Sequence, residues 1–498
     1  MSLKSFGAKI FAKKVVKGIN SWASKPVQAQ QKVFEQLVQT AKDTQFGKDH
    51  GFAEITTASD FAKRVPIRDY EDLKDYVDEV VAGKRDILWP GKPLYFAKTS
   101  GTTSGAKYIP LTKESMPAHI DAARNALLCY IHETGNVSFV DGKMIFLQGS
   151  PVMRQENGVK IGRLSGIVAH YVPNYLLKNR LPSWETNCID DWETKVDAIV
   201  EETKDEDMTV ISGIPSWVQM YFERLIAASG KKVGDLFENF NLFIYGGVNY
   251  EPYRANFEQL IGRNVDSIEL YPASEGFFAF QNEQNDSGLL LQLNSGIFYE
   301  FVKAENFFDE VPKRLTIGDV ELGMNYVMII STNAGLWAYN LGDTVIFTSL
   351  KPYKVIVSGR IKHFISAFGE HVIGKEVEQA LQEAMQKFKF SITEFTVAPN
   401  VLTEEGTLPY HEWMIEFNDS PADIDKVALF IDASMQRQNS YYYDLIQGKV
   451  LQPLKITSLP SNTFTNFMKS QGKLGGQNKI PRLSNDRKIA DQIHSLQA

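Results

Sequence analysis

Short apolar runs alternate with helical patterns between about residue 140 and residue 280, and this alternation limits the possible fold more than any other feature of the chain. The runs are rich in Ile, Phe, Val and Leu and occupy residues 143–147, 208–212, 242–245 and 268–271. Patterns typical of helices lie between them at 217–228 and 253–261. This order predicts an α/β layer on a largely parallel sheet. Ligands of such sheets bind beyond the carboxyl ends of the strands, so the loops after these runs should face one crevice.

The rest of the chain divides around this layer. Residues 288–358 are β-rich with hairpin signals and predict strands at 296–302, 326–330 and 345–347. After residue 360 the pattern predicts strands at 392–397, 412–417 and 455–458 and a helix at 423–438. A chain of 498 residues is too long for one ordinary core. We therefore predict a large N-terminal α/β domain with a β-rich subdomain over residues 1–360, and a small mobile α+β C-terminal domain over residues 361–498.

Local signals also predict where some helices begin and end. Residues 27–47 have a helical pattern, and we expect this helix to end near Gly47. Asp69 follows an extended entry set by Pro66 and can cap a helix. Ser216 can likewise cap the helix predicted at 217–228.

Composition excludes several classes of protein. The net charge of −7 gives no general attraction for nucleic acid, and we expect no nucleic-acid partner. No uninterrupted apolar run approaches the roughly 20 residues that span a bilayer. Two cysteines, Cys129 and Cys188, cannot form a disulfide framework or a four-ligand zinc site. A reduced, cytoplasmic location fits these features best.

The first 34 residues are basic and contain no acidic residue. Their lysines are Lys4, Lys9, Lys13, Lys14, Lys17, Lys25 and Lys32, and apolar residues recur at helical spacing at Leu3, Phe6, Ile10, Val16 and Ile19. Such a helix can lie on a membrane or pack its apolar stripe on its own protein. We expect packing on the protein and expect no membrane contact.

A hydroxyl-rich segment at residues 97–107 has the composition of a phosphate-binding loop. It holds two glycines, a closing Lys107 and the hydroxyl side chains of Thr99, Ser100, Thr102, Thr103 and Ser104. Glycine lets several backbone N–H groups point at one anion, while hydroxyls and lysine add donors and charge. The segment is not a Walker A loop, because Ala106 and Tyr108 stand where that motif needs Gly and Ser or Thr. The alternative is a flexible Ser/Thr/Gly linker.

Two carboxylates follow apolar runs at positions suited to a nucleotide. Glu275 lies at a predicted strand end, and Mg²⁺ is usually held by one or two carboxylates together with phosphate oxygens. Asp343 follows Gly342 in a predicted turn and could accept both hydroxyls of a ribose. A solvated carboxylate and a plain turn are the alternatives.

Two basic residues lie beyond these carboxylates. Arg360 stands beside the predicted domain boundary. Lys479 follows a glycine-rich stretch and precedes Pro481, which stiffens the chain. A lysine on a small mobile domain can enter a cleft and neutralise charge on a phosphoryl oxygen. A solvated surface lysine is the alternative.

These segments together resemble one branch of the adenylate-forming enzymes, the GH3 acyl acid–amido synthetases known from auxin and jasmonate conjugation in plants, with bacterial relatives. The similarity covers residues 27–490 and is carried by residues 64–71, 88–91, 99–107, 271–276, 339–343 and 477–482. It implies a large N-terminal domain and a small C-terminal domain that rotates between half-reactions. Differences from the plant members at 475–479 and 368–370 leave the acid and the amine open.

The resemblance also implies a role for each site residue. ATP phosphates would be held by Ser100, Gly101, Thr102, Thr103, Ser104 and Lys107. Gly246 and Gly247 would line the adenine, and Ser274 would lie beside the nucleotide. Asp343 would bind the ribose with help from Arg360, Glu275 would hold Mg²⁺, and Lys479 would serve adenylation.

The function implied is ATP-dependent activation of a carboxylic acid as an acyl-adenylate, followed by transfer to an amine, as from an amino acid. One alternative is an acyl-CoA ligase that uses the same adenylate. Another is a catalytically silent protein that binds a nucleotide or an acid on the same scaffold. Supplying coenzyme A or amino acids shows which of them consumes the adenylate and so distinguishes the two enzymes. The absence of ATP-dependent pyrophosphate release with any acid would indicate the silent binding protein.

Overall fold

The structure is a computed structural model that describes residues 3–100, 106–172, 178–247, 250–361, 372–400, 408–447, 450–474, 479–484 and 486–497. It contains two compact units. The first comprises Met1–Val248 and Asn264–Ile356, and the second comprises Asn249–Arg263 and Val357–Ala498. The division into domains at residue 360 stays a prediction. No helix in the described ranges is long and apolar enough to cross a membrane.

One half of the main sheet of the first unit is parallel. In order across the sheet, its strands are β6 (Arg180–Leu181), β3 (Lys143–Phe146), β7 (Met208–Ser212), β8 (Leu242–Gly246) and β9 (Asp266–Ala273). The centre of β7 and β8 is buried, as expected for strands covered on both faces. The predicted parallel α/β layer is confirmed.

The β-rich region continues this sheet. Its strands are β10 (Gly276–Gln281), β11 (Leu289–Leu291), β15 (Tyr353–Arg360), β14 (Tyr339–Leu350), β13 (Asn325–Thr332) and β12 (Ile297–Lys303). Strand β10 pairs antiparallel with both β9 and β11 and so connects the two halves. Within the described residues, eleven strands thus form one sheet, and the β-rich region shares it with the parallel layer.

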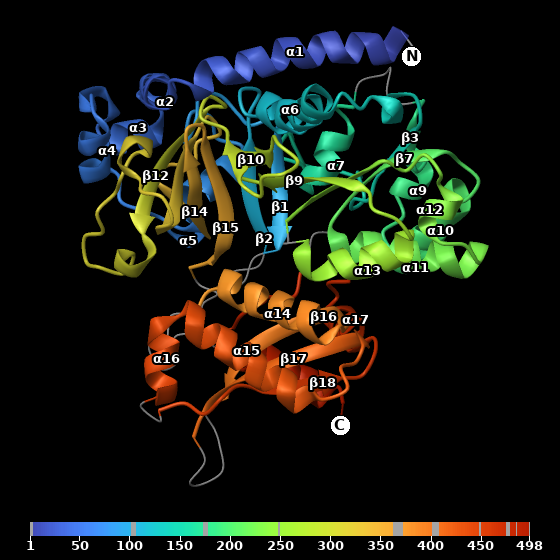
Figure 1. The fold of residues 1–498 in the computed structure, drawn as a ribbon. Helices are drawn as coiled ribbons and strands as arrows, with labels where there is room; N and C mark the ends of the chain where they lie inside the picture. The colour runs from blue at the N-terminus through green and yellow to red at the C-terminus, as the bar shows by residue number, and fades with distance from the viewer. Residues whose placement is uncertain are drawn as a thin grey trace. The chain divides into compact units, whose positions relative to one another are not determined.

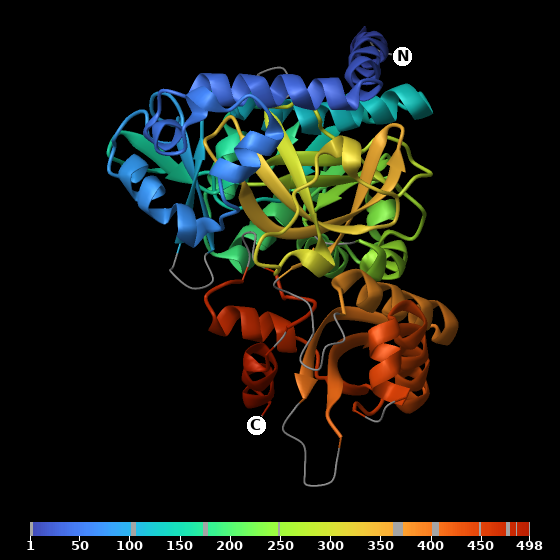
Figure 2. The ribbon, with the colours of Figure 1, turned by 90° about the vertical axis from the view of Figure 1, so that its left-hand side faces the viewer.

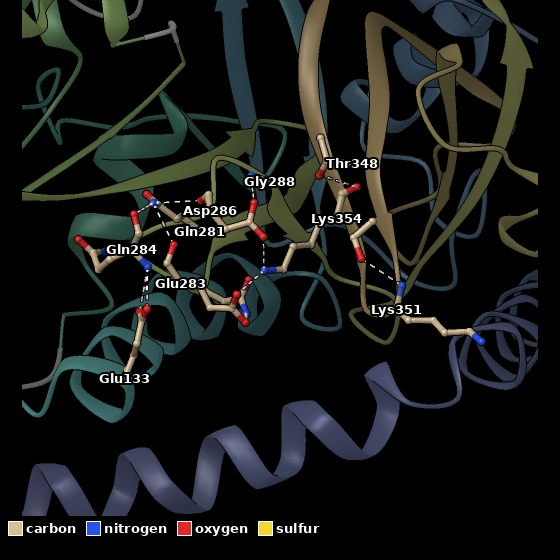
Figure 3. A network of polar contacts seen from close by, with 11 residues as sticks. Glu133, Gln281, Glu283, Gln284, Asp286, Gly288, Thr348, Lys351 and Lys354 are labelled. Carbon is tan, nitrogen blue, oxygen red and sulfur yellow. Dashed lines mark hydrogen bonds and ion pairs between the residues drawn. The ribbon is translucent and has the colours of Figure 1, made fainter.

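A buried lysine holds the loop between β10 and β11 (Figure 3). Lys354 of β15 has a side chain only 3% exposed, and its Nζ donates to Asp286 at 2.8 Å and to Glu283 at 3.0 Å. Burial alone would lower the pKa of Lys354, but these two carboxylates raise it above its ordinary value. Asp286 also accepts from the Gly288 backbone N–H at 2.8 Å. The charged lysine therefore fixes the loop that joins the antiparallel strands β10 and β11.

Helices cover the first unit. The long α1 (Leu3–Ala23) lies along α6 (Met116–Thr134), as Figures 1 and 2 show. The other helices of this unit among the described residues are α2 (Pro26–Ala41), α3 (Gln45–Asp49), α4 (Ala58–Arg64), α5 (Tyr70–Val81), α7 (Leu164–Ala169), α9 (Trp184–Asn187), α10 (Trp192–Thr203), α11 (Pro215–Ser229) and α12 (Val233–Leu236). Short 3-10 turns are η1 (Phe52–Glu54), η2 (Ser138–Val140), η3 (Ala304–Asn306) and η4 (Ile317–Asp319).

Two of the three local predictions need correction. The helix predicted at 27–47 is wrong in extent: α2 ends at Ala41, and Thr44 then caps α3 by accepting from the Gly47 N–H at 3.0 Å. A Cβ on Gly47 would lie 2.1 Å from the Ala41 carbonyl oxygen, so glycine permits this tight turn. Ser216 is not the cap of α11, because the helix begins at Pro215 and Ile214 is its N-cap. The prediction for Asp69 is confirmed, since its side chain accepts from two N–H groups of α5.

A second, smaller sheet carries the hydroxyl-rich loop. Its order is β2 (Ala106–Leu111), β1 (Tyr95–Ser100), β5 (Val159–Gly162) and β4 (Arg154–Glu156). Strands β1 and β2 form an antiparallel hairpin in which Ser100 stands opposite Ala106. The predicted phosphate loop is thus the tip of this hairpin.

The second unit is an α+β structure, as predicted. Its sheet has the order β16 (Ser391–Asn400), β17 (Tyr410–Asp419) and β18 (Lys455–Leu459). Its helices are α13 (Glu251–Ile261), α14 (Gly374–Phe388), α15 (Ile424–Gln438), α16 (Ser440–Gln447), α17 (Thr463–Ser470) and α18 (Lys488–Ser495). A buried core of Leu381, Trp413 and Ile431 joins the sheet to α14 and α15. Helix α13 comes from between β8 and β9 in the sequence, yet it packs on β16 and α14.

Candidate active site

The hydroxyl-rich loop differs from a Walker A loop in its structural context. It leads from one strand of a hairpin into the other, whereas a Walker A loop leads into a helix. A helix dipole is therefore not available at its end, and an anion would depend on backbone N–H groups, hydroxyls and Lys107. The predictions for Gly101, Thr102, Thr103 and Ser104 lie outside the described residues, and of Ser100 the structure describes the backbone.

Lys107 is held beside an aromatic ring. Its Nζ lies 5.5 Å from the centroid of Tyr70, which is 3% exposed. The Tyr70 hydroxyl accepts from the Tyr108 backbone N–H at 2.9 Å, and burial raises the pKa of this phenol. Tyr70 is the first residue of α5, which Asp69 caps. A capped helix thus supports the hairpin and the lysine at its tip.

Asp343 lies in a bulged strand. Residue Val327 of β13 pairs with Thr344 and Ile329 pairs with Asn340, so three residues of β14 stand opposite Met328 alone. Gly342 makes the bulge possible with a φ of 84°, and its N–H donates to the Asn340 side chain at 2.8 Å. The predicted turn around Asp343 is instead a bulge within β14, and its role at the ribose stays a prediction. The bulge re-aims the carboxylate without ending the strand.

A tyrosine ties Asp343 to the strand that carries Ser274 and Glu275. The Tyr271 hydroxyl of β9 donates to Asp343 Oδ2 at 2.7 Å. Ser274 and Glu275 form the two-residue turn between β9 and β10, where Ala273 pairs with Gly276. Ser274 is buried, whereas Glu275 is partly exposed. Two carboxylates distant in sequence are thereby attached to one end of one strand.

The end of the neighbouring strand β8 adds Gly246 and Gly247. Gly246 pairs with Leu270, and a Cβ there would lie 2.6 Å from the Leu270 carbonyl oxygen and 3.2 Å from Pro272 Cδ. Packing alone therefore requires glycine at this position. Gly247 is exposed and has a φ of 85°, which glycine adopts readily.

An extended segment connects the hairpin with β14. The Arg68 N–H donates to the Ala338 carbonyl at 3.0 Å, and the Asn340 N–H donates to the Arg68 carbonyl at 2.7 Å. Tyr70, which contacts Lys107, lies two residues beyond Arg68. The first unit thus links Lys107 through this segment to the strand of Asp343. Tyr70 and Tyr271 lie within the motifs at 64–71 and 271–276, but the sequence alone predicts no contact for either side chain.

In the second unit, the segment after Lys479 is anchored along β16. Lys479 is exposed, and Ile480 is buried. The Pro481 carbonyl accepts from Thr396 Oγ1 at 2.7 Å, and the Arg482 carbonyl accepts from the Val397 N–H at 3.0 Å. The lysine therefore stands immediately before a fixed segment. Arg360, the last residue of β15, is exposed and belongs to the same unit.

Arg482 fastens this segment with its side chain, a role that the sequence analysis missed. Its guanidinium forms a buried ion pair with Glu394 and donates to the Tyr253 hydroxyl at 2.7 Å. It also lies 4.7 Å from the centroid of Phe395. The side chain is only 13% exposed. These contacts, three positions after Lys479, fix the direction from which the lysine projects.

The side chains that could donate to a metal ion indicate which kind of metal site this protein can form. In the described ranges, no group of three His, Cys, Asp or Glu side chains gathers as a resident metal centre would need. Glu275 is a partly exposed carboxylate in a turn. This fits Mg²⁺, which takes one or two carboxylates and completes its shell with phosphate oxygens and water.

Solved structures with the same fold define the class of protein. GH3.15 acyl acid amido synthetase superposes with a TM-score of 0.77 at 14% identity, covering 96% of this chain and 95% of that one. A 2-hydroxyisobutyryl-CoA ligase in the postadenylation state superposes with a TM-score of 0.56 at 13% identity, covering 96% and 92%. The chain thus has the fold of the adenylate-forming ligases, and the predicted fold class is confirmed.

Matches to family models identify the family to which the chain belongs within this fold class. The GH3 family N-terminal domain matches residues 15–187, the central domain matches 290–360, and the C-terminal domain matches 375–488. The chain belongs to the GH3 family, as the resemblance in its motifs predicted.

Curated relatives are amido synthetases from plants. The jasmonoyl–L-amino acid synthetase JAR4 of Nicotiana attenuata is 21% identical over 385 residues, which are 64% of this chain and 66% of that protein. The indole-3-acetic acid-amido synthetase GH3.3 of Arabidopsis thaliana is 23% identical over 40% of this chain and 35% of its own length. GH3.15 of the same plant is 33% identical over 20% of this chain and 17% of its own length. The matches thus span two-thirds or less of these relatives.

Proposed function

We propose that this protein activates a carboxylic acid with ATP as an acyl-adenylate and transfers the acyl group to the amine of an amino acid, forming an amide and AMP. The observation that carries the proposal is the match of all three GH3 domain models, in order, to one chain. One curated relative is named as a jasmonoyl–L-amino acid synthetase and another as an amido synthetase of indole-3-acetic acid, which supports an amino acid as the acceptor.

The nucleotide is proposed to lie at the carboxyl ends of β8 and β9. The hairpin tip would hold its phosphates through Ser100, Gly101, Thr102, Thr103, Ser104 and Lys107. Gly246 and Gly247 would line the adenine, Ser274 would lie beside the nucleotide, and Asp343 with Arg360 would hold the ribose. The bond from Tyr271 to Asp343 supports this role, because it orients the carboxylate at the end of β9 that carries Ser274 and Glu275.

Magnesium is proposed to enter with ATP and to be held by Glu275. When bound, it would offset negative charge on the phosphates and orient them. The residues of the proposed nucleotide site would themselves position the nucleotide and place positive charge beside its phosphates.

The proposed chemistry has two steps. The carboxylate oxygen of the acid attacks the α-phosphorus and pyrophosphate leaves; the amine then attacks the acyl carbon and AMP leaves. Lys479 would neutralise charge on the phosphoryl oxygens during the first step. Positioning and charge suffice for this reaction, so no covalent nucleophile on the protein is required.

We further propose that the enzyme acts in the cytoplasm. Cys129 and Cys188 are both free thiols, and burial raises the pKa of the Cys129 thiol to about 12. An inert buried thiol suits a reducing compartment. The proposed partners are the acid and the amino acid, with no nucleic acid.

Pyrophosphate release tests the proposed function. The purified protein would be given ATP, Mg²⁺ and a panel of carboxylic acids, first alone and then with each amino acid or with coenzyme A. We expect release with some acids and an amide product with an amino acid. Consumption of the adenylate by coenzyme A alone would identify an acyl-CoA ligase, and no release with any acid would identify a silent binding protein.

Substitutions at the proposed ribose site should weaken nucleotide binding. We expect Asp343→Ala to raise the Kd for ATP about 10- to 100-fold, because it removes hydrogen bonds to a charged acceptor worth about 1.5–3 kcal/mol. Tyr271→Phe removes one neutral hydrogen-bond donor to Asp343 and should raise the Kd for ATP a few-fold. Isothermal titration with ATP measures both, and an unchanged Kd in Asp343→Ala would remove this residue from the nucleotide site.

Arg482 should act as a positioning residue for Lys479. We expect Arg482→Ala to lower kcat for adenylate formation about tenfold while the KM for ATP changes less than twofold, because the lysine loses its anchored support. Arg482→Lys keeps the charge and should recover part of the loss. The control is Arg437→Ala, which removes an exposed arginine paired with Glu383 in the same unit. Equal effects on kcat and KM, or no partial recovery by lysine, would contradict a positioning role.

A further inference from the structure

Helix α1 has two faces with different surroundings. Its inner face packs on α6, with Ala12 and Ile19 buried against a cluster that contains Ala122 and Ala126. This confirms the expectation that the helix packs on its own protein. Figure 1 shows α1 as a long helix at the periphery of the first unit, with α6 on one side.

The outer face of α1 combines exposed apolar side chains with lysines. Phe6 and Ile10 are each 58% exposed, four residues apart on one face. The lysines of the helix are all exposed, and they are Lys4, Lys9, Lys13, Lys14 and Lys17. At 100° per residue, Lys13 and Lys17 fall on the same side as Phe6 and Ile10, and Lys14 flanks it. The 21 residues of α1 contain no acidic side chain to offset these charges.

The mixture of groups selects one kind of partner. A nucleic acid would use the lysines but not two exposed apolar side chains between them. An anionic lipid surface uses both, because the apolar groups enter the acyl boundary while the lysines contact the headgroups. We propose that the outer face of α1, formed by Phe6, Ile10, Lys13, Lys14 and Lys17, binds an anionic membrane surface.

This inference revises the expectation of no membrane contact. That expectation treated packing and membrane binding as alternatives for a single apolar stripe. In the structure the stripe on α6 contains Ala12 and Ile19, whereas Phe6 and Ile10 lie outside it. The helix can therefore stay packed on α6 while its outer face meets lipid.

Vesicle sedimentation of the full chain tests the proposal. Vesicles of phosphatidylcholine with 30% phosphatidylglycerol would be compared with vesicles of phosphatidylcholine alone. We expect the chain to sediment with the anionic vesicles and to be released by salt. We expect at least a tenfold weaker binding for the triple variant Lys13→Glu, Lys14→Glu, Lys17→Glu and for the double variant Phe6→Ser, Ile10→Ser.

A matched control has the same change in net charge elsewhere. The variant Lys231→Glu, Lys232→Glu, Lys313→Glu alters three exposed lysines outside α1 and should bind within twofold of the unaltered chain. An unchanged Tm verifies that each variant is folded. No sedimentation of the unaltered chain would overturn the proposal. Equal weakening by the control, or full binding by the Phe6 and Ile10 variant, would also overturn it, since binding would then follow charge alone.

Discussion

Lys479→Ala is expected to slow adenylate formation at least about 100-fold while ATP binding changes less than about threefold. A lysine that meets charge as it develops on the phosphoryl group stabilises the transition state more than the bound substrate. The side chain is exposed and stands immediately before a segment that Thr396, Val397 and Arg482 hold on β16. Exchange of pyrophosphate into ATP measures the first step, and titration with ATP measures binding.

The control for this substitution is Lys473→Ala, which removes an exposed lysine six residues earlier. It should leave pyrophosphate exchange near its starting rate. If Lys479→Ala also exchanges pyrophosphate near the starting rate, Lys479 has a role other than adenylation. A parallel loss of ATP affinity would show that the lysine binds the ground state.

Glu300→Gln is expected to lower the free energy of unfolding of the first unit by about 3–5 kcal/mol, because breaking a buried ion pair leaves an uncompensated charge. Glu300 of β12 and Arg314 have side chains only 3% and 6% exposed. Arg314 Nε donates to Glu300 at 2.8 Å, and its guanidinium also donates to the carbonyls of Val65 and Ala62. Burial raises the pKa of the Glu300 carboxyl, and Arg314 opposes this shift by favouring the charged form.

The chain offers a matched exposed pair as the control. Arg64 and Glu54 lie 2.6 Å apart with side chains 41% and 71% exposed, and exposed pairs contribute about 0–1 kcal/mol. Denaturant unfolding followed by tryptophan fluorescence would compare Glu300→Gln with Glu54→Gln. Similar midpoints for the two variants would mean that the buried pair contributes little. Replacing both Glu300 and Arg314 by methionine should be far less damaging than Glu300→Gln alone.

The parts of the fold that follow from local pattern could be predicted from the sequence. The apolar runs predicted the strands β7 and β8 because strands buried on both faces need continuous apolar residues. Asp69 was recognisable as a cap because its side chain acts on N–H groups two and three residues away.

The parts that depend on distant contacts could not be predicted. Nothing in residues 276–281 indicates that β10 would join the parallel and antiparallel strands in one sheet. Helix α13 has an ordinary helical pattern, and its packing on β16 depends on residues more than a hundred positions away. The carboxylate of Asp343 was identified from its motif, but its bulge and its bond to Tyr271 arise from pairing across β13 and from the position of β9.

The long sheet of the first unit has two outer strands, and both are protected against pairing with another sheet. Strand β6 contains only Arg180 and Leu181, which is too short to template a neighbour. Along β12, Gln30 of α2 donates to the Ile297 carbonyl and accepts from the Tyr299 N–H, each at 2.9 Å, while Leu315 pairs with Phe301. The outward backbone groups at these three positions are thus already occupied. A second copy could therefore pair with β12 at these positions only by displacing Gln30 and Leu315.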